Sequence, residues 1–252
     1  MSATAVCHVT EEHKKQFQNE GYFILKNVMP PEHLQLLRDE CQRFIDLENA
    51  RMDADKTDVH GINHRNKRYF VAYACQNSQR IPEFVYSDLM AEICRATLGP
   101  DAYLFWDQYV VKGAEVGMKF GWHQDSGYVG HPHKPYLTCW CSLDDMSVAN
   151  GTAFILPFSR AGTKEVQPHV KEEGTNDLIG YHGKDPGEPI LVPAGSIAVF
   201  SSLTFHRSGA NTTNKMRRVY LPQYSAEVIM NKEGTAPQAQ TECFLKDGKR
   251  VR

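Results

Sequence analysis

The first 100 residues carry a mainly helical pattern of apolar and polar positions. Pro30 and Pro31 open a segment in which apolar residues recur every three to four positions, the spacing of an amphipathic helix. A shorter helix is expected between Thr10, a suitable cap, and Gly21, and a further helix over residues 87–98. A strand is expected over residues 22–25, whereas the polar, aperiodic residues 50–67 predict a long loop. The apolar positions of the amphipathic segment are Leu34, Leu37, Cys41, Phe44 and Ile45.

From residue 101 onwards the pattern changes to short β-type runs separated by turn residues. Ala-Asn-Gly at residues 149–151 and Pro-Ala-Gly-Ser at residues 193–196 are turn signals between such runs. Evenly spaced short strands favour a double-sheet jelly roll with helices packed outside. The predicted strands are residues 103–106, 109–112, 136–143, 152–156, 190–192, 196–200 and 218–224.

The arrangement of these elements favours a single domain over residues 1–252, because no internal repeat or low-complexity linker divides the chain. A helical part over about residues 1–100 would precede a jelly-roll core over about residues 101–225. Residues 231–252 form a polar C-terminal tail that is either disordered or in contact with a neighbour. The expected fold class is mainly β with flanking helices: a double-stranded β-helix, or cupin-like barrel, with the N-terminal helices outside.

Composition narrows the classes of function. The chain of 252 residues is 41% apolar and 23% charged, which is the balance of a globular protein. The net charge of -2 and the lack of a long basic run argue against a nucleic-acid partner, and no apolar run is long enough to cross a membrane. The first seven residues show no secretory signal, and seven cysteines without a C-x-x-C pair fit reduced thiols, so a cytoplasmic location is expected.

The sharpest candidate for chemistry is the segment Trp-His-Gln-Asp at residues 122–125. On a strand, His123 and Asp125 would project to the same face. His206 follows the β-type run 196–200 and could supply a second imidazole from a late strand of the same barrel. Two imidazoles and one carboxylate on one face of an ion are the arrangement of non-haem Fe(II) oxygenases. His-x-Asp alone is a weak motif, however, and one further histidine among 11 adds little by itself.

The arginine pair downstream of His206 strengthens this interpretation. A cosubstrate with a carboxylate tail needs a forked, permanently charged donor, which Arg217 can supply, and Ser208 could add a hydroxyl group. Adjacent strand residues face opposite ways, so an inward Arg217 requires an outward Arg218. Val219 and Leu221 would then face inward with Arg217, while Tyr220 would face outward with Arg218. A slip of one residue in register would exchange the two arginines.

With these residues the chain resembles the phytanoyl-CoA dioxygenase-like (PhyH) family of Fe(II)/2-oxoglutarate-dependent oxygenases, from about Phe17 to Tyr224. The combination of matching segments is specific, although each piece is weak. The segments are QFQNEGYFILKN (16–27), WHQD (122–125), WCSLDD (140–145), NGTAFILP (150–157), VPAGSIAVF (192–200), HRSGAN (206–211) and RR (217–218).

This resemblance implies a metal centre and a reaction class. His123, Asp125 and His206 would be the ligands of Fe(II), with 2-oxoglutarate as cosubstrate and dioxygen as oxidant. Halogenating relatives have a small residue at the position of Asp125, so the carboxylate here favours hydroxylation or another oxidation over chlorination.

The resemblance also implies a set of cosubstrate contacts. Arg217 would form a salt bridge with the C5 carboxylate of 2-oxoglutarate, and Ser208 would hydrogen-bond the same group. Trp140 would form an aromatic wall beside the cosubstrate, and Gln108 falls near another contacting position. One departure is visible: residues 157–160 are Pro-Phe-Ser-Arg where the family often has Pro-Gly-Ser-His, which changes the residues at the pocket mouth.

The expected function is oxidation, most simply hydroxylation, of a C–H bond of a small organic metabolite or natural-product intermediate, with release of succinate and CO2. Two alternatives stay open: a cupin-type metalloenzyme that does not use 2-oxoglutarate, and a non-catalytic barrel that binds a small molecule. Residues 50–75 and 157–189 are expected to be lids over the substrate. Lys112, Trp122 and Tyr128 are candidates for the wall of the substrate pocket, although core packing also explains Trp122. The substrate and the oligomeric state are left open.

Overall fold

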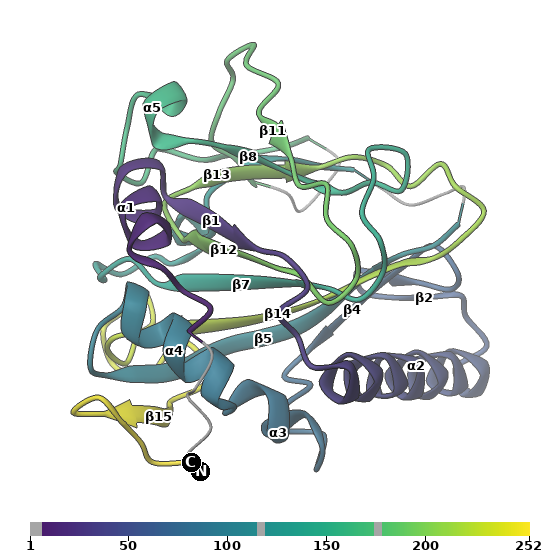
Figure 1. Cartoon of the computed structure of the whole chain (residues 1–252). Coiled ribbons are helices and arrows are strands. Elements are labelled where there is room, and N and C mark those ends of the chain that lie inside the picture. Colours follow the sequence, from purple (N-terminus) through teal and green to yellow (C-terminus); the bar gives the residue numbers. More distant parts are fainter. Residues whose placement is uncertain (1–6, 115–118, 174–177) are drawn as a thin grey trace.

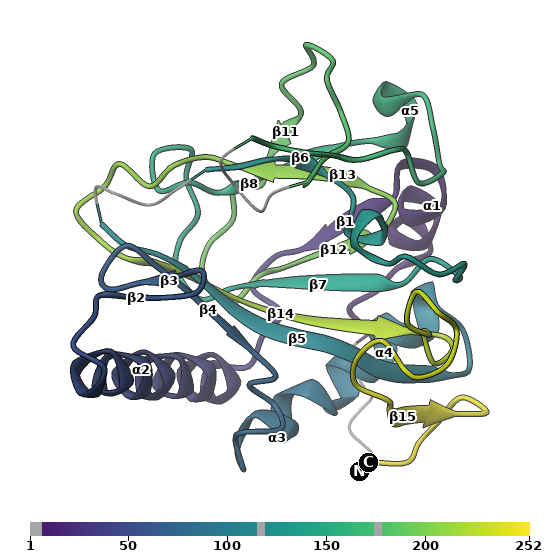
Figure 2. The same ribbon diagram turned by 180° about the vertical axis from the view of Figure 1, so that it is seen from behind.

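The computed structural model describes residues 7–114, 119–173 and 178–252, and most of their strands belong to two facing sheets (Figure 1). The major sheet has the order β1-β12-β7-β14-β5-β4-β3-β2, with β15 joined to β5 and β16 joined to β15. The minor sheet has the order β11-β8-β13-β6. It lies over one face of the major sheet, as the view from behind also shows (Figure 2).

The strands of the major sheet are β1 (Tyr22–Leu25), β2 (Val59–His60), β3 (Asn63–His64), β4 (Arg68–Ala72), β5 (Ala102–Lys112), β7 (Leu137–Ser142), β12 (Ile197–Ser201), β14 (Arg217–Ser225), β15 (Glu242–Lys246) and β16 (Lys249–Arg250). Those of the minor sheet are β6 (Phe120–His123), β8 (Ala153–Leu156), β11 (Glu188–Pro189) and β13 (Phe205–Ser208). A separate antiparallel pair is formed by β9 (Val170–Lys171) and β10 (Leu178–Ile179).

The helices α2, α3 and α4 cover the face of the major sheet that is turned away from the minor sheet, whereas α1 lies beside β1 (Figures 1 and 2). The Tyr109 hydroxyl on β5 donates to the backbone carbonyl of Leu37, and the Tyr224 hydroxyl on β14 donates to that of Val85. These bonds tie the sheet to the helices at the same time as the rings fill the space between them. The helical elements are α1 (Glu11–Glu20), α2 (Pro31–Ala54), α3 (Ile81–Val85), α4 (Asp88–Thr97), the 3-10 turn η1 (Asp125–Tyr128) and α5 (Phe158–Ala161).

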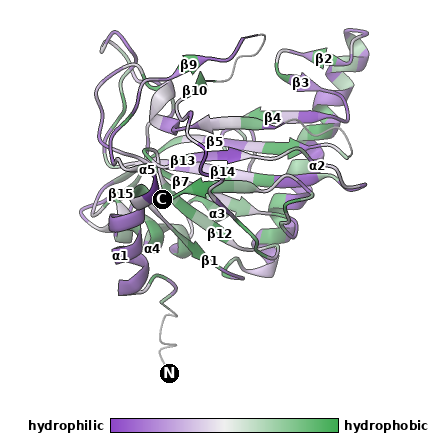
Figure 3. Cartoon of the chain, turned by 90° about the horizontal axis from the view of Figure 1, so that it is seen from above, coloured by the Kyte–Doolittle hydropathy of each residue, from purple (hydrophilic) through white to green (hydrophobic). Residues whose placement is uncertain are grey.

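Alternation along the strands of the major sheet separates two cores. On β14, Tyr220 and Tyr224 pack into the cluster beneath the helices, whereas Val219 and Leu221 pack into the cluster between the two sheets. Figure 3 shows that β12 is largely hydrophobic and that β5 and β14 carry both hydrophobic and hydrophilic residues, while α1, which has no buried residue, is largely hydrophilic. The mainly β, jelly-roll fold class expected from the sequence is thereby confirmed.

The predicted helices begin where the structure places them, but the predicted end of α2 is wrong. Thr10 caps α1 by accepting from the backbone N–H of His13, and Gly21 ends it with a left-handed φ of 82°. The prediction of a loop over residues 50–67 is wrong, because α2 continues to Ala54 with Met52 fully buried. After the helix, β2 and β3 form a short hairpin within the same stretch.

Three strand predictions also need correction. Residues 103–106 and 109–112 belong to one continuous strand, β5, because Asp107 is buried and bonded rather than placed in a turn. Residues 190–192 are not a strand; β11 ends at Pro189, although Ile190 and Val192 are buried. β4 was not predicted at all, because its five residues follow a polar run.

The C-terminal stretch 231–252 is not a disordered tail in this structure. β15 pairs with β5, and Phe244 and Leu245 on β15 are fully buried in the core beneath the helices. The C-terminal stretch thus packs on its own chain. Its sequence looks polar because its buried apolar residues are few.

The cysteines of the structure form no disulfide among the described residues. All seven are free thiols, and Cys139 and Cys141 are buried in the core on β7, which supports packing rather than metal binding as their role. In the part of the chain that is described, no helix has the length and apolar content needed to cross a membrane.

Candidate metal and cosubstrate site

The three predicted metal ligands meet at one edge of the space between the sheets. β13 pairs with β6 so that His206 lies directly opposite His123, and the two ring centroids are 4.2 Å apart. One oxygen of Asp125, Oδ1, lies 3.9 Å from Nε2 of His123 and 3.6 Å from Nε2 of His206. Together the three side chains offer ligand atoms within 4.8 Å of one another.

Asp125 reaches this point in a different way from the one predicted. β6 ends at His123, and Asp125 is the first residue of η1 rather than the next inward residue of a strand. The backbone N–H of Ser126 donates to the carbonyl of Ser202, and that of Gly127 donates to the carbonyl of Gln124. These bonds bend the chain after His123, so the carboxylate approaches from a turn.

Backbone carbonyls orient both imidazoles. Nδ1 of His123 lies 2.9 Å from the carbonyl oxygen of Gly121, and Nδ1 of His206 lies 3.1 Å from that of Thr204. A carbonyl oxygen only accepts, so each Nδ1 carries the hydrogen and each Nε2 presents its lone pair. Both lone pairs are thus available to one ion.

The carboxylate of Asp125 is held through its other oxygen. Thr138 on β7 donates to Oδ2 at 2.6 Å, and Gln223 on β14 donates to the same oxygen at 3.0 Å. Oδ1 is therefore left to face the imidazoles. Thr138 and Gln223 were not among the predicted site residues, because their approach to Asp125 depends on how strands far apart in sequence pair.

Arg217 faces the interior, and Arg218 does not. The Arg217 side chain is 2% exposed, and its guanidinium carbon lies 5.9 Å from the ring centroid of Trp140. Arg218 lies on the other face, where it donates to Asp144 at 2.6 Å. The order of the arginines in the sequence analysis, with Val219 facing inward, matches this placement.

The Arg217 guanidinium has hydrogen-bonding capacity to spare. Nη2 donates to the carbonyl of Gly151 at 2.8 Å, whereas the buried Nε and Nη1 atoms have no hydrogen-bond partner among the residues that the structure describes. Burial lowers the pKa of Arg217 to about 10, so the group is still charged at neutral pH. Buried charged donors without an acceptor are costly, and their presence here marks a place for a carboxylate.

Lys112 stands beside Arg217 and was not predicted to belong to this corner. The two residues are directly opposite each other on β5 and β14, and the Lys112 Nζ donates to the Ser208 hydroxyl at 2.8 Å and to the carbonyl of Gly209. Burial, and next the charges of Arg217 and Arg68, lower the pKa of Lys112 to about 5, so the amine is neutral at pH 7. Since Ser208 accepts from Lys112, its own hydrogen is free to donate to an anion.

Gln108 is on the same inner face of β5 as Lys112, four residues earlier and opposite Leu221 of β14. Its side chain is partly buried, as expected for a residue that lines the space between the sheets. The even spacing from Gln108 to Lys112 is the signal by which strand alternation could have placed the lysine in this corner.

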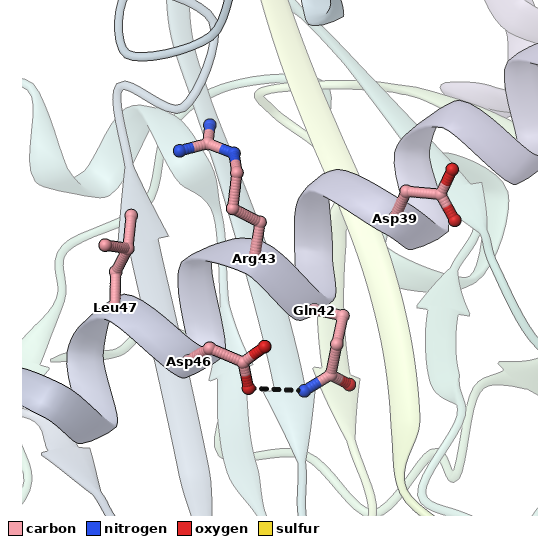
Figure 4. Close-up of a pocket in the computed structure, with 5 residues that line it drawn as sticks. All are labelled: Asp39, Gln42, Arg43, Asp46 and Leu47. Atoms are coloured by element: carbon pink, nitrogen blue, oxygen red, sulfur yellow. Dashed lines mark hydrogen bonds between the residues drawn. The ribbon is translucent and has the colours of Figure 1, made fainter.

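A surface pocket on α2 lies apart from this site, because α2 packs on the opposite face of the major sheet (Figure 4). In it the Gln42 amide donates to Asp46 at 2.8 Å, and Arg43 pairs with Glu40. These polar groups satisfy one another along the helix, so the pocket offers no candidate chemistry.

The predicted lids are more structured than free loops. Residues 50–75 contain the end of α2, a hairpin and β4. Residues 157–189 contain α5, β9, β10 and β11, and residues 174–177 of this predicted lid fall outside the described part of the chain.

Two features indicate which groups would fit here. The donor set of two imidazole nitrogens and one carboxylate oxygen on one side suits ferrous iron and leaves positions open for other ligands. The unpartnered nitrogens of Arg217, with the Ser208 hydroxyl near Lys112, suit the far carboxylate of a 2-oxo diacid.

Comparison with known proteins adds a family and a set of relatives. The family model described as Phytanoyl-CoA dioxygenase (PhyH) matches residues 17–219. The peroxisomal phytanoyl-CoA dioxygenase of Mus musculus is 24% identical over 236 residues, which cover 83% of this chain and 66% of the mouse protein. The ectoine dioxygenase of Stutzerimonas stutzeri (strain A1501) is 22% identical over 227 residues, which cover 83% of this chain and 74% of that enzyme. The chain thus spans a little under two thirds of the mouse protein.

Solved structures share the fold. The non-heme alpha ketoglutarate dependent carbocyclase SnoK from nogalamycin biosynthesis superposes with a TM-score of 0.71 at 17% identity, covering 92% of this chain and 93% of SnoK. EctD from S. alaskensis gives a TM-score of 0.70 at 17% identity, with 95% and 86% covered. EvdO2 from Micromonospora carbonacea var. aurantiaca, solved with 2-oxoglutarate, gives 0.66 at 20% identity, with 89% and 93% covered.

Proposed function

Since the chain belongs to the phytanoyl-CoA dioxygenase (PhyH) family, whose members are Fe(II)- and 2-oxoglutarate-dependent oxygenases, we propose that it hydroxylates a C–H bond of a small organic metabolite or natural-product intermediate. The observation that carries this proposal is that two arrangements occur between the same two sheets. Three metal-ligating side chains converge, and a buried guanidinium with two unpartnered nitrogens lies on the inner face of the adjoining sheet.

In this proposal His123, Asp125 and His206 hold the iron. The chain contributes a fixed geometry: the carbonyls of Gly121 and Thr204 set the tautomer of each imidazole. When bound, ferrous iron with 2-oxoglutarate supplies the activation of dioxygen, with succinate and CO2 as coproducts. Pre-set ligands lower the cost of ordering the site when the metal binds.

The cosubstrate would be held by its far carboxylate. Arg217 offers Nε and Nη1 to this group, and the Ser208 hydroxyl offers a third donor. Trp140 provides an apolar wall beside the guanidinium, and it excludes water from the charge pair. A desolvated, bidentate arginine–carboxylate contact selects for a diacid of one length, because both ends must be bound at once.

The relatives are named for small molecules of different chemical kinds, so their names do not single out one substrate. The names of the relatives include an ectoine dioxygenase and a probable hypophosphite dioxygenase from Stutzerimonas stutzeri, and a carbocyclase from nogalamycin biosynthesis. The substrate of this chain is therefore best sought by experiment among chemically diverse small metabolites.

The test is the release of succinate from 2-oxoglutarate, measured with Fe(II), oxygen and a metabolite panel. We expect one substrate class to raise succinate release well above the rate without substrate, with one oxygen atom added to the product by mass spectrometry. The His206→Ala variant serves as the metal-free control. An anaerobic titration in which Fe(II) and 2-oxoglutarate give the wild type no visible charge-transfer band would contradict the proposal.

A further inference from the structure

The residue between two of the proposed metal ligands, Gln124, is completely buried, and its amide is almost fully bonded. Nε2 donates to the carbonyl of Glu165 at 3.0 Å and to that of Leu203 at 2.6 Å. Oε1 accepts from the backbone N–H of Gln167 at 2.7 Å. One side chain thus joins three separate segments of the chain.

The first of these segments, residues 163–169, is here named the strap. It lies within the stretch 157–189 that the sequence indicated as a lid. His169 at its end accepts the backbone N–H of Gln124 through Nε2 at 3.0 Å, and its Nδ1 donates to the carbonyl of Gln167 at 2.7 Å. The strap is therefore bound to the His123-x-Asp125 motif by both the side chain and the backbone of Gln124.

Close packing supports the same contact. A Cβ added at Gly127 would come within 2.4 Å of the His169 ring, and one added at Gly180 would come within 2.5 Å. Neither glycine has a left-handed backbone that would itself require glycine. The absence of a side chain at these positions leaves room for the ring in its place against Gln124.

The second segment is the turn before β13. Leu203, whose carbonyl accepts from Gln124, is next to Thr204, whose carbonyl orients His206. The amide of Gln124 therefore adds a buried bond between the segment that carries His123 and Asp125 and the segment that carries His206. This bond acts beside the pairing of β6 with β13 and the bond from Ser126 to Ser202, and it is the one that also reaches the strap.

We propose that Gln124 and His169 are positioning residues that couple docking of the strap to metal binding by His123, Asp125 and His206. This inference rests on the metal site of the proposed function and goes beyond it. The coupling is reciprocal: if a docked strap tightens metal binding by some factor, bound metal suppresses opening of the strap by the same factor. The strap responds to the metal before any substrate arrives, unlike a lid that closes on substrate.

The test measures the two sides of this coupling separately. Co(II) affinity is measured by calorimetry, and opening of the strap by hydrogen exchange of the peptide that contains residues 163–169. For the wild type we expect Co(II) to slow exchange of the strap. For Gln124→Met, which keeps the length of the side chain but not its bonds, we expect Co(II) affinity to fall about 10- to 100-fold. Exchange of the strap should be fast and insensitive to Co(II).

Two further variants leave the metal motif intact. His169→Phe keeps a planar ring without the acceptor, and Gly180→Ala pushes the ring from its place; both should change affinity and exchange in the same direction as Gln124→Met. They keep the test decisive if Gln124→Met does not fold. Gln42→Met, at an exposed glutamine of α2, is the matched control and should behave as the wild type.

The outcomes separate this inference from the proposed function. A wild type that binds no Co(II) contradicts the metal site itself. A wild type that binds Co(II) while all three variants bind it equally well, or while strap exchange ignores the metal, overturns the coupling alone.

Discussion

At the scale of single residues, the corner of the site around Arg217 brings two basic side chains together in the protein interior. Arg217 and Lys112 are both fully buried and stand directly opposite each other on neighbouring strands. Among the described residues no ion pair joins either side chain to a carboxylate. The nearby carboxylate of Asp144 is paired with Arg218 instead. Such an arrangement is stable when the amine gives up its proton and the guanidinium receives an anionic ligand.

The first prediction concerns the two arginines. Replacing Arg217 with Met should weaken 2-oxoglutarate binding by about 2 kcal/mol or more, about 30-fold, because a buried carboxylate would lose its charged partner. Arg218→Met is the matched control, since it removes the same charge from the opposite face of β14. Calorimetric titration of the metal-loaded protein with 2-oxoglutarate measures both. Equal losses in the two variants would contradict the assigned roles and leave open a cupin-type enzyme without this cosubstrate.

The second prediction concerns the pH dependence of stability. The pKa of Lys112 is lowered from 10.5 to about 5, so between these values the unfolded chain binds a proton that the folded chain does not. Stability contributed by this group therefore rises with pH, by up to about 1.4 kcal/mol per pH unit. Lys112→Met should be more stable than the wild type, and its advantage should grow as the pH falls from 9 to 6.

Urea unfolding of the cosubstrate-free protein at several pH values measures this difference. Lys171→Met, at an exposed lysine, is the matched control. An advantage of Lys112→Met that stays constant across the range would show that Lys112 keeps its proton in the folded state.

At the scale of elements, pairing of strands decides which residues meet. β13 is held between β8 and β6, so His206 faces His123 across a strand pair although they are far apart in sequence. β14 is held between β7 and β5, so Gln223 and Arg217 both lie on its inner face. A bulge between Gln223 and Tyr224 then shifts the register towards the end of the strand.

The third prediction concerns β15. Phe244 is fully buried and lies beside Tyr86 and Tyr224, with ring centroids 5.3 and 5.8 Å away. Phe244→Ala should therefore lower the free energy of unfolding by about 3–5 kcal/mol, through lost burial and the cavity left behind. Val251→Ala, at a residue 54% exposed, should change it little. A small effect of Phe244→Ala in denaturant unfolding would mean that the C-terminal stretch does not belong to the core.

At the scale of the whole molecule, the proposed metal centre links the two sheets. His123 and His206 belong to the minor sheet, whereas Asp125 is held by Thr138 and Gln223 of the major sheet. An ion that binds all three side chains would therefore oppose separation of the sheets. Its removal should be felt by the whole fold rather than by one loop.

The fourth prediction is a metal-dependent shift in thermal unfolding. Co(II) at about 100 times its dissociation constant should stabilise the fold by about 2.7 kcal/mol, and a protein of this size gains about 2–4 °C in Tm for each kcal/mol. We therefore expect a rise of about 5–10 °C that a chelator reverses. His206→Ala should show no such rise; a shift of the same size in that variant would place the metal elsewhere.

The sequence by itself determined the fold class, the helix starts and a short set of candidate side chains. Periodicity and turn residues are local signals, and the residue types of His123, Asp125 and His206 restrict the chemistry by their ligand atoms alone. Only the tertiary structure decided how these side chains meet: that Asp125 approaches from a turn, that Lys112 is paired directly opposite Arg217, and that Gln124 binds the strap. These outcomes depend on register between strands and on packing between distant segments, and the energy of such contacts leaves no local pattern in the chain.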